Sequence, residues 1–139
     1  MRVSEIDHIG VAVKSIEDAM PYYRDVLGLE FIGTETVGDQ KVRVAIFRIG
    51  DSRLELLEPT SDDSPISGFL EKRGNGLHHV CVLVDSIESA LEQHRRAGSQ
   101  LIDSVPRIGA HGKKIAFVHP RSTSGVLLEL CEADVKTHD

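Results

Sequence analysis

Apolar residues along this chain recur with the two periods that distinguish strands from helices. β-Branched runs at residues 6–13 and 79–84 predict two buried strands. Each run is followed by a stretch with helical spacing that opens on Ser15 or Ser86 and closes near a glycine. Serine caps helix N-termini and glycine ends helices, so each half of the chain is predicted to begin with a strand and a helix.

Three further strands are predicted after each helix, separated in the first half by Gly-Asp turn signals. They are expected at residues 29–36, 42–49 and 53–58 of the first half and at residues 100–104, 114–119 and 125–131 of the second. Each half therefore reads as one βαβββ module.

The two halves also repeat in sequence. His8-Ile-Gly-Val-Ala-Val matches His79-Val-Cys-Val-Leu-Val, which follows 71 residues later. The closing strands match as well, with Leu54-Glu55-Leu56-Leu57-Glu58 against Leu128-Glu129-Leu130-Cys131-Glu132. Because one module cannot bury its sheet alone, we expect an α+β fold in which two tandem βαβββ modules, related by a pseudo-twofold axis, form a curved mixed sheet around a cleft.

The length of 139 residues and the absence of a Pro/Gly/Ser-rich linker predict a single domain over residues 1–139. Its first module covers about residues 4–60 and its second about residues 75–133. The segment between them, about residues 61–74, is expected to carry a linker helix at residues 66–72.

Charge and hydropathy exclude several classes of partner. A net charge of −6 argues against nucleic acid, which clustered Lys and Arg bind. The sequence shows no signal peptide and no long apolar segment, so we expect no membrane association and a cytoplasmic location. Cys81 and Cys131 lie in apolar runs and are expected to serve as small buried hydrophobes.

Four residues occupy matching places in the two modules: His8, Glu55, His79 and Glu129. A lone strand histidine is usually a hydrogen-bonded core or surface group, and a lone strand glutamate usually faces solvent. Duplication changes this expectation, because two histidines and two carboxylates would meet at the pseudo-twofold axis. Such a set suits divalent cobalt, manganese, nickel or zinc, with positions left for water or substrate. The neighbouring His78 falls on the opposite strand face and is expected to be structural.

A second group of candidates lies in the loop Gly109-Ala110-His111-Gly112-Lys113. Its glycines allow the backbone to approach a ligand closely, and an imidazole exchanges protons near neutral pH. His111 and Lys113 are therefore candidates for binding an anionic substrate.

The duplicated module with its His and Glu pairs resembles the vicinal-oxygen-chelate superfamily and, within it, the methylmalonyl-CoA epimerases. The resemblance covers nearly the whole chain and is carried by Tyr22-Tyr23-Arg24-Asp25-Val26-Leu27-Gly28, Asp63-Ser64-Pro65-Ile66, Gly76-Leu77-His78-His79, the loop from Gly109 to Lys113, and His119-Pro120 with Gly125-Val126-Leu127-Leu128-Glu129-Leu130. The first segment is common across the superfamily, whereas the linker and the later segments are more particular to the epimerases.

The resemblance implies an isomerase that interconverts the R and S forms of methylmalonyl-CoA at C2. It implies a divalent metal, cobalt first, with manganese, nickel or zinc as alternatives, held by His8, Glu55, His79 and Glu129. It also implies a homodimer and an acyl-CoA substrate. The metal would stabilise an enolate, while two groups exchange the C2 proton on opposite faces.

This sequence departs from the family pattern at two positions. Glu55 stands where some relatives have glutamine, which adds a negative charge. Val44 stands where some relatives have a proposed catalytic glutamate. Glu129 is therefore the expected first base, and Glu55, His111 or a bound water are candidates for the second.

Two other functions remain open at the level of sequence. One is a different metal enzyme of the superfamily, such as a glyoxalase-like isomerase. The other is a metal-free small-molecule-binding protein of the same fold, against which the complete ligand set and the low aromatic content argue.

Overall fold

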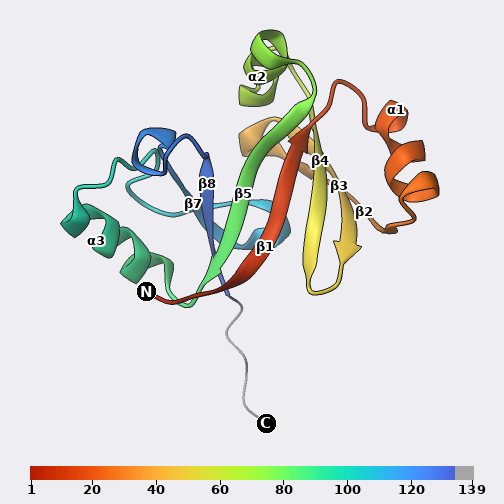
Figure 1. The fold of residues 1–139 in the computed structure, drawn as a ribbon. Coiled ribbons are helices and arrows are strands. Elements are labelled where there is room, and N and C mark those ends of the chain that lie inside the picture. The colour runs from red at the N-terminus through yellow and green to blue at the C-terminus, as the bar shows by residue number, and fades with distance from the viewer. Residues whose placement is uncertain (134–139) are drawn as a thin grey trace. The chain divides into compact units, whose positions relative to one another are not determined.

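The computed structural model describes residues 1–133, and hydrogen bonds order eight strands as β2-β3-β4-β1-β5-β8-β7-β6 (Figure 1). The strands are β1 Val3–Ala12, β2 Glu30–Val37, β3 Val42–Ile49, β4 Ser52–Pro59, β5 Gly76–Val84, β6 Arg107–Ile108, β7 Lys114–Val118 and β8 Leu128–Glu132. The α-helices are α1 Ile16–Met20, α2 Pro65–Arg73 and α3 Ile87–Ala97.

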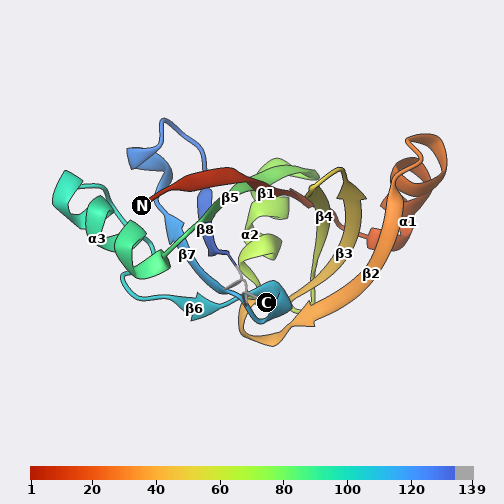
Figure 2. The same cartoon turned by 90° about the horizontal axis from the view of Figure 1, so that it is seen from below.

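The chain forms two compact units, one of residues 8–79 and one of residues 1–7 with residues 80–133. In the first unit β4 pairs parallel with β1 and antiparallel with β3, which pairs antiparallel with β2. The helix α1 lies along this group of strands, as Figures 1 and 2 both show. Its core is formed by Val13, Ile16, Ala45, Phe47, Leu54 and Leu56.

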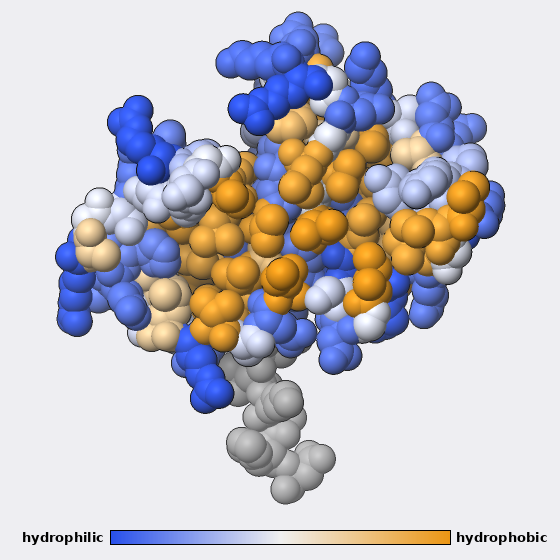
Figure 3. Space-filling view, in the orientation of Figure 1, coloured by the Kyte–Doolittle hydropathy of each residue, from blue (hydrophilic) through white to orange (hydrophobic). Residues whose placement is uncertain are grey.

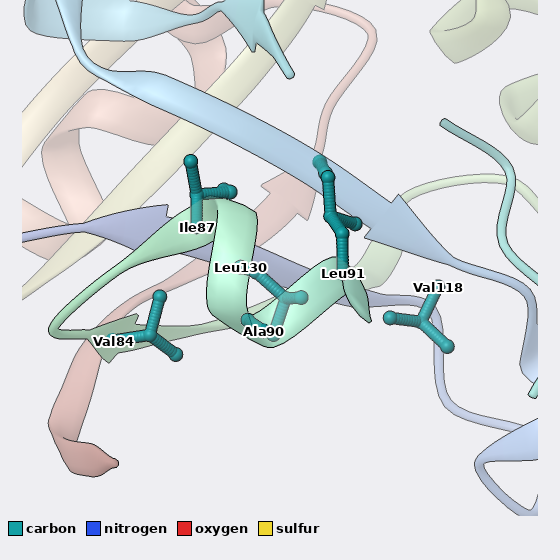
Figure 4. Packing of buried hydrophobic residues seen from close by; sticks show 7 residues of the cluster. Val84, Ile87, Ala90, Leu91, Val118 and Leu130 are labelled. Atoms are coloured by element: carbon teal, nitrogen blue, oxygen red, sulfur yellow. The ribbon is translucent and has the colours of Figure 1, made fainter. Parts of the chain in front are cut away.

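The second unit repeats this pattern. Strand β8 pairs parallel with β5 and antiparallel with β7, and β7 pairs with the short β6. The helix α3 covers these strands, and Figure 4 shows its apolar side chains directed at theirs. The core residues of this cluster are Val84, Ile87, Ala90, Leu91, Ala116, Val118 and Leu130.

Equivalent hydrogen bonds begin the two helices. Ser15 accepts a bond from the Asp18 amide at 3.1 Å, and Ser86 accepts one from the Ser89 amide at 3.2 Å. A carboxylate from the last strand of each module adds a second bond, since Glu58 accepts from Ile16 N and Glu132 from Ile87 N. These matched contacts confirm the predicted repeat of βαβββ modules.

The first helix differs from the prediction. We expected one helix up to Gly28, but the α-helix ends at Met20 and the chain continues as a π-helix over Pro21–Val26. Pro21 has no N–H to donate, so the regular hydrogen-bond ladder is interrupted there. Gly28 does end the segment, with φ of 74°.

A predicted strand in the second half is also wrong. Residues 100–104 form no strand, and only an isolated bridge joins Leu101 to Val118. The carboxylate of Asp103 accepts a hydrogen bond from Phe117 N at 2.8 Å and so occupies a donor that a ladder would use. The edge strand β6 forms later, after Pro106, at Arg107–Ile108.

The linker helix α2 is confirmed, with Ser64 as its N-cap and Pro65 in its first turn. Hydrogen bonds from Lys41 and Ser61 lower the pKa of the preceding Asp63 carboxyl to about 2. These contacts tie the start of α2 to the turn before β3.

Apolar side chains lie along β1 on the surface seen in Figure 3. Exposed apolar residues of this strand include Val3 and Ile6. Within residues 1–133, no helix combines the length and the apolar character that crossing a bilayer requires.

Candidate metal centre

Two of the predicted ligands, His8 on β1 and His79 on β5, face each other in the unit of residues 8–79. Each is about 6% exposed. Their Nε2 atoms lie 3.1 Å apart, and the rings meet edge to face with centroids 5.2 Å apart. Both ring nitrogens therefore point at one buried place.

Gly10 makes room for the ring of His79. A Cβ atom at position 10 would lie 2.3 Å from His79 Cε1 and 2.6 Å from His79 Nδ1, closer than side chains approach one another. Gly10 shares a face of β1 with His8 because strand residues alternate. The space that this glycine leaves beside His8 is occupied by the second histidine.

Glu55 reaches the same place from β4. It is 2% exposed, and its Oε1 lies 3.6 Å from His8 Nε2. The guanidinium of Arg53 lies 3.7 Å from the other carboxylate oxygen. A carboxylate this deeply buried requires positive partners, which Arg53 and His8 supply when His8 is protonated or ligated to a cation.

His78 contacts the site, contrary to our expectation of a purely structural side chain on the opposite face. Its Nδ1 lies 2.9 Å from Nδ1 of His79. The ring of His78 in turn contacts Phe69 of α2 edge to face, with centroids 5.0 Å apart. The outer nitrogen of His79 is thus held by a neighbour, which leaves its Nε2 facing His8.

Glu129, the fourth predicted ligand, belongs to the other unit. It is 6% exposed on β8, in register with Cys81 of β5 and Phe117 of β7. Its membership of the metal site stays a prediction from the sequence repeat.

The predicted substrate residues also lie in the second unit, in a tight loop before β7. His111 is exposed and adopts left-handed φ and ψ of 64° and 17°, while Lys113 is half-buried. Gly109 donates its N–H to the Lys113 carbonyl at 2.9 Å. A Cβ on Gly109 would lie 2.7 Å from the Cδ1 atom of Ile115, so a larger residue here would displace the Ile115 side chain.

Val44, at the position of the missing family glutamate, is 2% exposed on β3. It pairs in register with Leu57, and its neighbour on the same face, Ile46, pairs with Glu55. The side chains that β3 presents beside Glu55 are therefore apolar. Glu35 of β2 pairs in register with Val44 and is half-buried, so the carboxylate beside this position comes from the next strand.

The two cysteines interact with each other. Both are buried free thiols. A hydrogen bond with Cys131, together with burial, raises the pKa of the Cys81 thiol, and the same bond lowers the pKa of Cys131. Ile115 and Phe117 pack against them, as expected for small buried hydrophobes.

The pair of His8 and His79 fits a divalent first-row cation, and the Glu55 carboxylate lies 3.6 Å from His8 Nε2. Two imidazole nitrogens bound to one such ion at about 2.0–2.1 Å stand roughly 3 Å apart, and here they stand 3.1 Å apart. Ligating histidines usually carry a hydrogen-bond partner on their other nitrogen, as His79 does here.

Sequence reasoning missed two contributors to this site, His78 and Arg53. His78 is next to the predicted ligand His79 in sequence, and Arg53 shares a strand face with Glu55. A pattern of strand residues does not show which neighbouring side chains contact a ligand. The only available signal for His78 was the adjacent pair His78-His79 in the resemblance motif.

Comparison with known proteins adds a family and close relatives. Residues 7–117 match the family described as the Glyoxalase/Bleomycin resistance protein/Dioxygenase superfamily. The uncharacterized protein YqjC of Bacillus subtilis is 51% identical over 99% of this chain and 98% of its own.

Two relatives with named activities match over similar lengths. An ethylmalonyl-CoA/methylmalonyl-CoA epimerase of Cereibacter sphaeroides is 38% identical over 92% of this chain and 97% of its own. A variant of Streptomyces coelicolor methylmalonyl-CoA epimerase, in complex with 2-nitronate-propionyl-CoA, superposes with a TM-score of 0.92 at 35% identity, covering 99% of this chain and 100% of that one. The predicted fold of two βαβββ modules is confirmed by this likeness.

Proposed function

Because this chain belongs to the glyoxalase/bleomycin resistance protein/dioxygenase superfamily, we propose that it is a metal-dependent methylmalonyl-CoA epimerase. The observation that carries the proposal is the buried pair of imidazole nitrogens 3.1 Å apart beside the Glu55 carboxylate. Relatives named for this activity, which match over nearly their whole length, support it. The substrate is an acyl-CoA thioester, and the reaction interconverts its R and S forms at C2.

The proposed ligands are His8, Glu55, His79 and, by its equivalence to Glu55 in the repeat, Glu129. Nitrogen and carboxylate donors suit cobalt, with manganese, nickel or zinc as alternatives. A divalent ion held by these residues would supply positive charge to stabilise the negative charge that develops when C2 loses its proton. Arg53 offsets part of the negative charge that Glu55 brings to this set.

Epimerisation requires proton removal on one face of C2 and proton return on the other. We assign removal to the Glu129 carboxylate. Return falls to Glu55, to His111 or to a bound water, because the buried Val44 side chain has no exchangeable proton. Lys113 and His111, in the loop that the Gly109 turn shapes, are the proposed contacts for the anionic part of the substrate.

Association is the remaining part of the proposal. A homodimer fits the resemblance to the epimerases, and the apolar side chains exposed on β1 offer surface for a second copy.

Deuterium exchange at C2 tests the reaction directly. Protein loaded with cobalt should convert a single epimer of methylmalonyl-CoA to a mixture in deuterated water, with deuterium entering at C2 as stereochemistry is lost. Mass spectrometry and chiral analysis follow the two together. Unchanged substrate in the presence of confirmed bound metal contradicts the epimerase, and tight binding without exchange would identify a binding protein instead.

His78 is expected to position His79, so removing its ring nitrogen should weaken metal binding. In His78→Phe the ring contact with Phe69 can persist, but the partner of His79 Nδ1 is lost. Loss of such a partner typically costs about 10- to 100-fold in metal affinity. Competition with a chromogenic chelator measures this change.

The matched control is His78→Asn, which restores a polar atom near the place of Nδ1. It should recover most of the affinity that His78→Phe loses. Wild-type affinity in His78→Phe would show that His78 acts through packing alone.

A further inference from the structure

A second cluster of metal-ligand atoms lies in the unit of residues 1–7 and 80–133. A carboxylate oxygen of Asp7 and the Sγ atoms of Cys81 and Cys131 all lie within 4.8 Å of one another. The exposed fractions of these residues are 7%, 0% and 3%. The cluster contains sulfur, which distinguishes it from the imidazole and carboxylate site of His8, His79 and Glu55.

Strand register explains how the two thiols meet. Cys81 pairs with Glu129 on the parallel strands β5 and β8, and Cys131 pairs with Leu83. Because residues two apart on a strand share a face, Cys131 is the diagonal neighbour of Cys81 on one side of the sheet. The apolar side chains around the two thiols are Leu83, Ile115, Phe117 and Leu127.

The composition of this cluster favours a soft cation. Thiolate ligands select zinc and similar thiophilic ions over the hard cations that carboxylates alone would bind. A zinc ion held by three protein ligands keeps a fourth position for water. Ion binding would itself drive deprotonation of the thiols, because the thiolate is the form that ligates a metal.

We propose that Asp7, Cys81 and Cys131 form a second metal site, specific for a thiophilic divalent cation of the zinc class. The site joins the first strand of the chain to β5 and β8 of the same unit. It is independent of the proposed epimerase reaction, because none of its three side chains is assigned to that chemistry.

Cobalt absorption tests the site in the full-length protein. Metal-free protein, kept reduced with a phosphine, is titrated with Co²⁺ under anaerobic conditions. We expect a thiolate-to-cobalt charge-transfer band in the near ultraviolet. It should saturate by two ions per chain, because the imidazole site also takes cobalt, and it should disappear when Zn²⁺ is added in excess over both sites. Absence of the band, with two free thiols per chain counted after denaturation, would overturn the proposal.

Variants separate the two sites. The band should persist in His79→Ala, disappear in Cys131→Ser, and appear with more than about 10-fold weaker cobalt affinity in Asp7→Asn. Loss of the band in His79→Ala would assign the sulfur ligand to the imidazole site. Unchanged cobalt affinity in Asp7→Asn would show that the Asp7 carboxylate is not a ligand. Either result contradicts the site as proposed. The wild-type titration decides the question even if a cysteine variant fails to fold.

Discussion

Replacing His79 with alanine should abolish metal binding and epimerase turnover together. The ring of His79 supplies one of two nitrogens that face each other at 3.1 Å, so its loss leaves His8 without the opposing imidazole. In the proposed reaction, the developing negative charge would lose its main electrostatic stabilisation without the cation, so turnover should fall by at least about 10³-fold. Metal content by mass spectrometry and the C2 exchange assay measure the two effects.

The control is His94→Ala, which removes an imidazole from α3 in the other unit. His94 binds the Ala90 carbonyl of its own helix, so its loss should leave metal content and exchange near wild type. Retained metal and near-normal turnover in His79→Ala would exclude His79 from the site.

Adding a single methyl group at Gly10 should have the next largest effect. The alanine Cβ would lie 2.3 Å from the ring of His79, so the ring must leave its position. Since the ring can move more easily than the strand, we expect Gly10→Ala to fold but to bind metal on the order of 100-fold more weakly, with turnover reduced accordingly. Isothermal titration with Co²⁺ and a thermal melt separate affinity from stability.

Gly68→Ala provides the comparison. Gly68 lies within α2, and a Cβ there meets nothing within 4 Å. This variant should bind metal normally and gain about 0.5–1 kcal/mol in stability, as alanine does over glycine in a helix. If Gly10→Ala also retains wild-type affinity, the close packing of His79 over β1 has no role in the site.

The sequence predicted the modules because their pattern is local. Strand alternation, the serine caps and the repeated closing strands each depend on a few neighbouring residues, and β3 was predicted with its observed bounds, Val42–Ile49. The failures arose where a side chain competed with the backbone or a residue lacked a donor. The Asp103 carboxylate accepts the hydrogen bond of the Phe117 amide, and Pro21 lacks the N–H that would continue the hydrogen bonds of α1. Neither effect appears in hydrophobic periodicity.

The candidate site was predictable to a similar extent. Duplication identified His8, Glu55 and His79, which the structure brings together. It did not identify His78 or Arg53, because the matching positions of the other module carry different residues. Asp7 stands at the place equivalent to His78, and Leu127 at the place equivalent to Arg53. Interactions that occur in only one module leave no trace in a repeat.

The repeated segments that end in Glu58 and Glu132 place their two acidic residues on opposite faces of the strand. Glu55 faces His8, whereas Glu58 accepts a hydrogen bond from the first turn of α1, and Glu132 does the same for α3. Architecture and chemistry are thus encoded by different residues of one short motif. A residue at the position of Glu55 can therefore change, and with it the reaction, while the residue at the position of Glu58 keeps the helix in place. This separation suits a superfamily whose name unites glyoxalases, resistance proteins and dioxygenases.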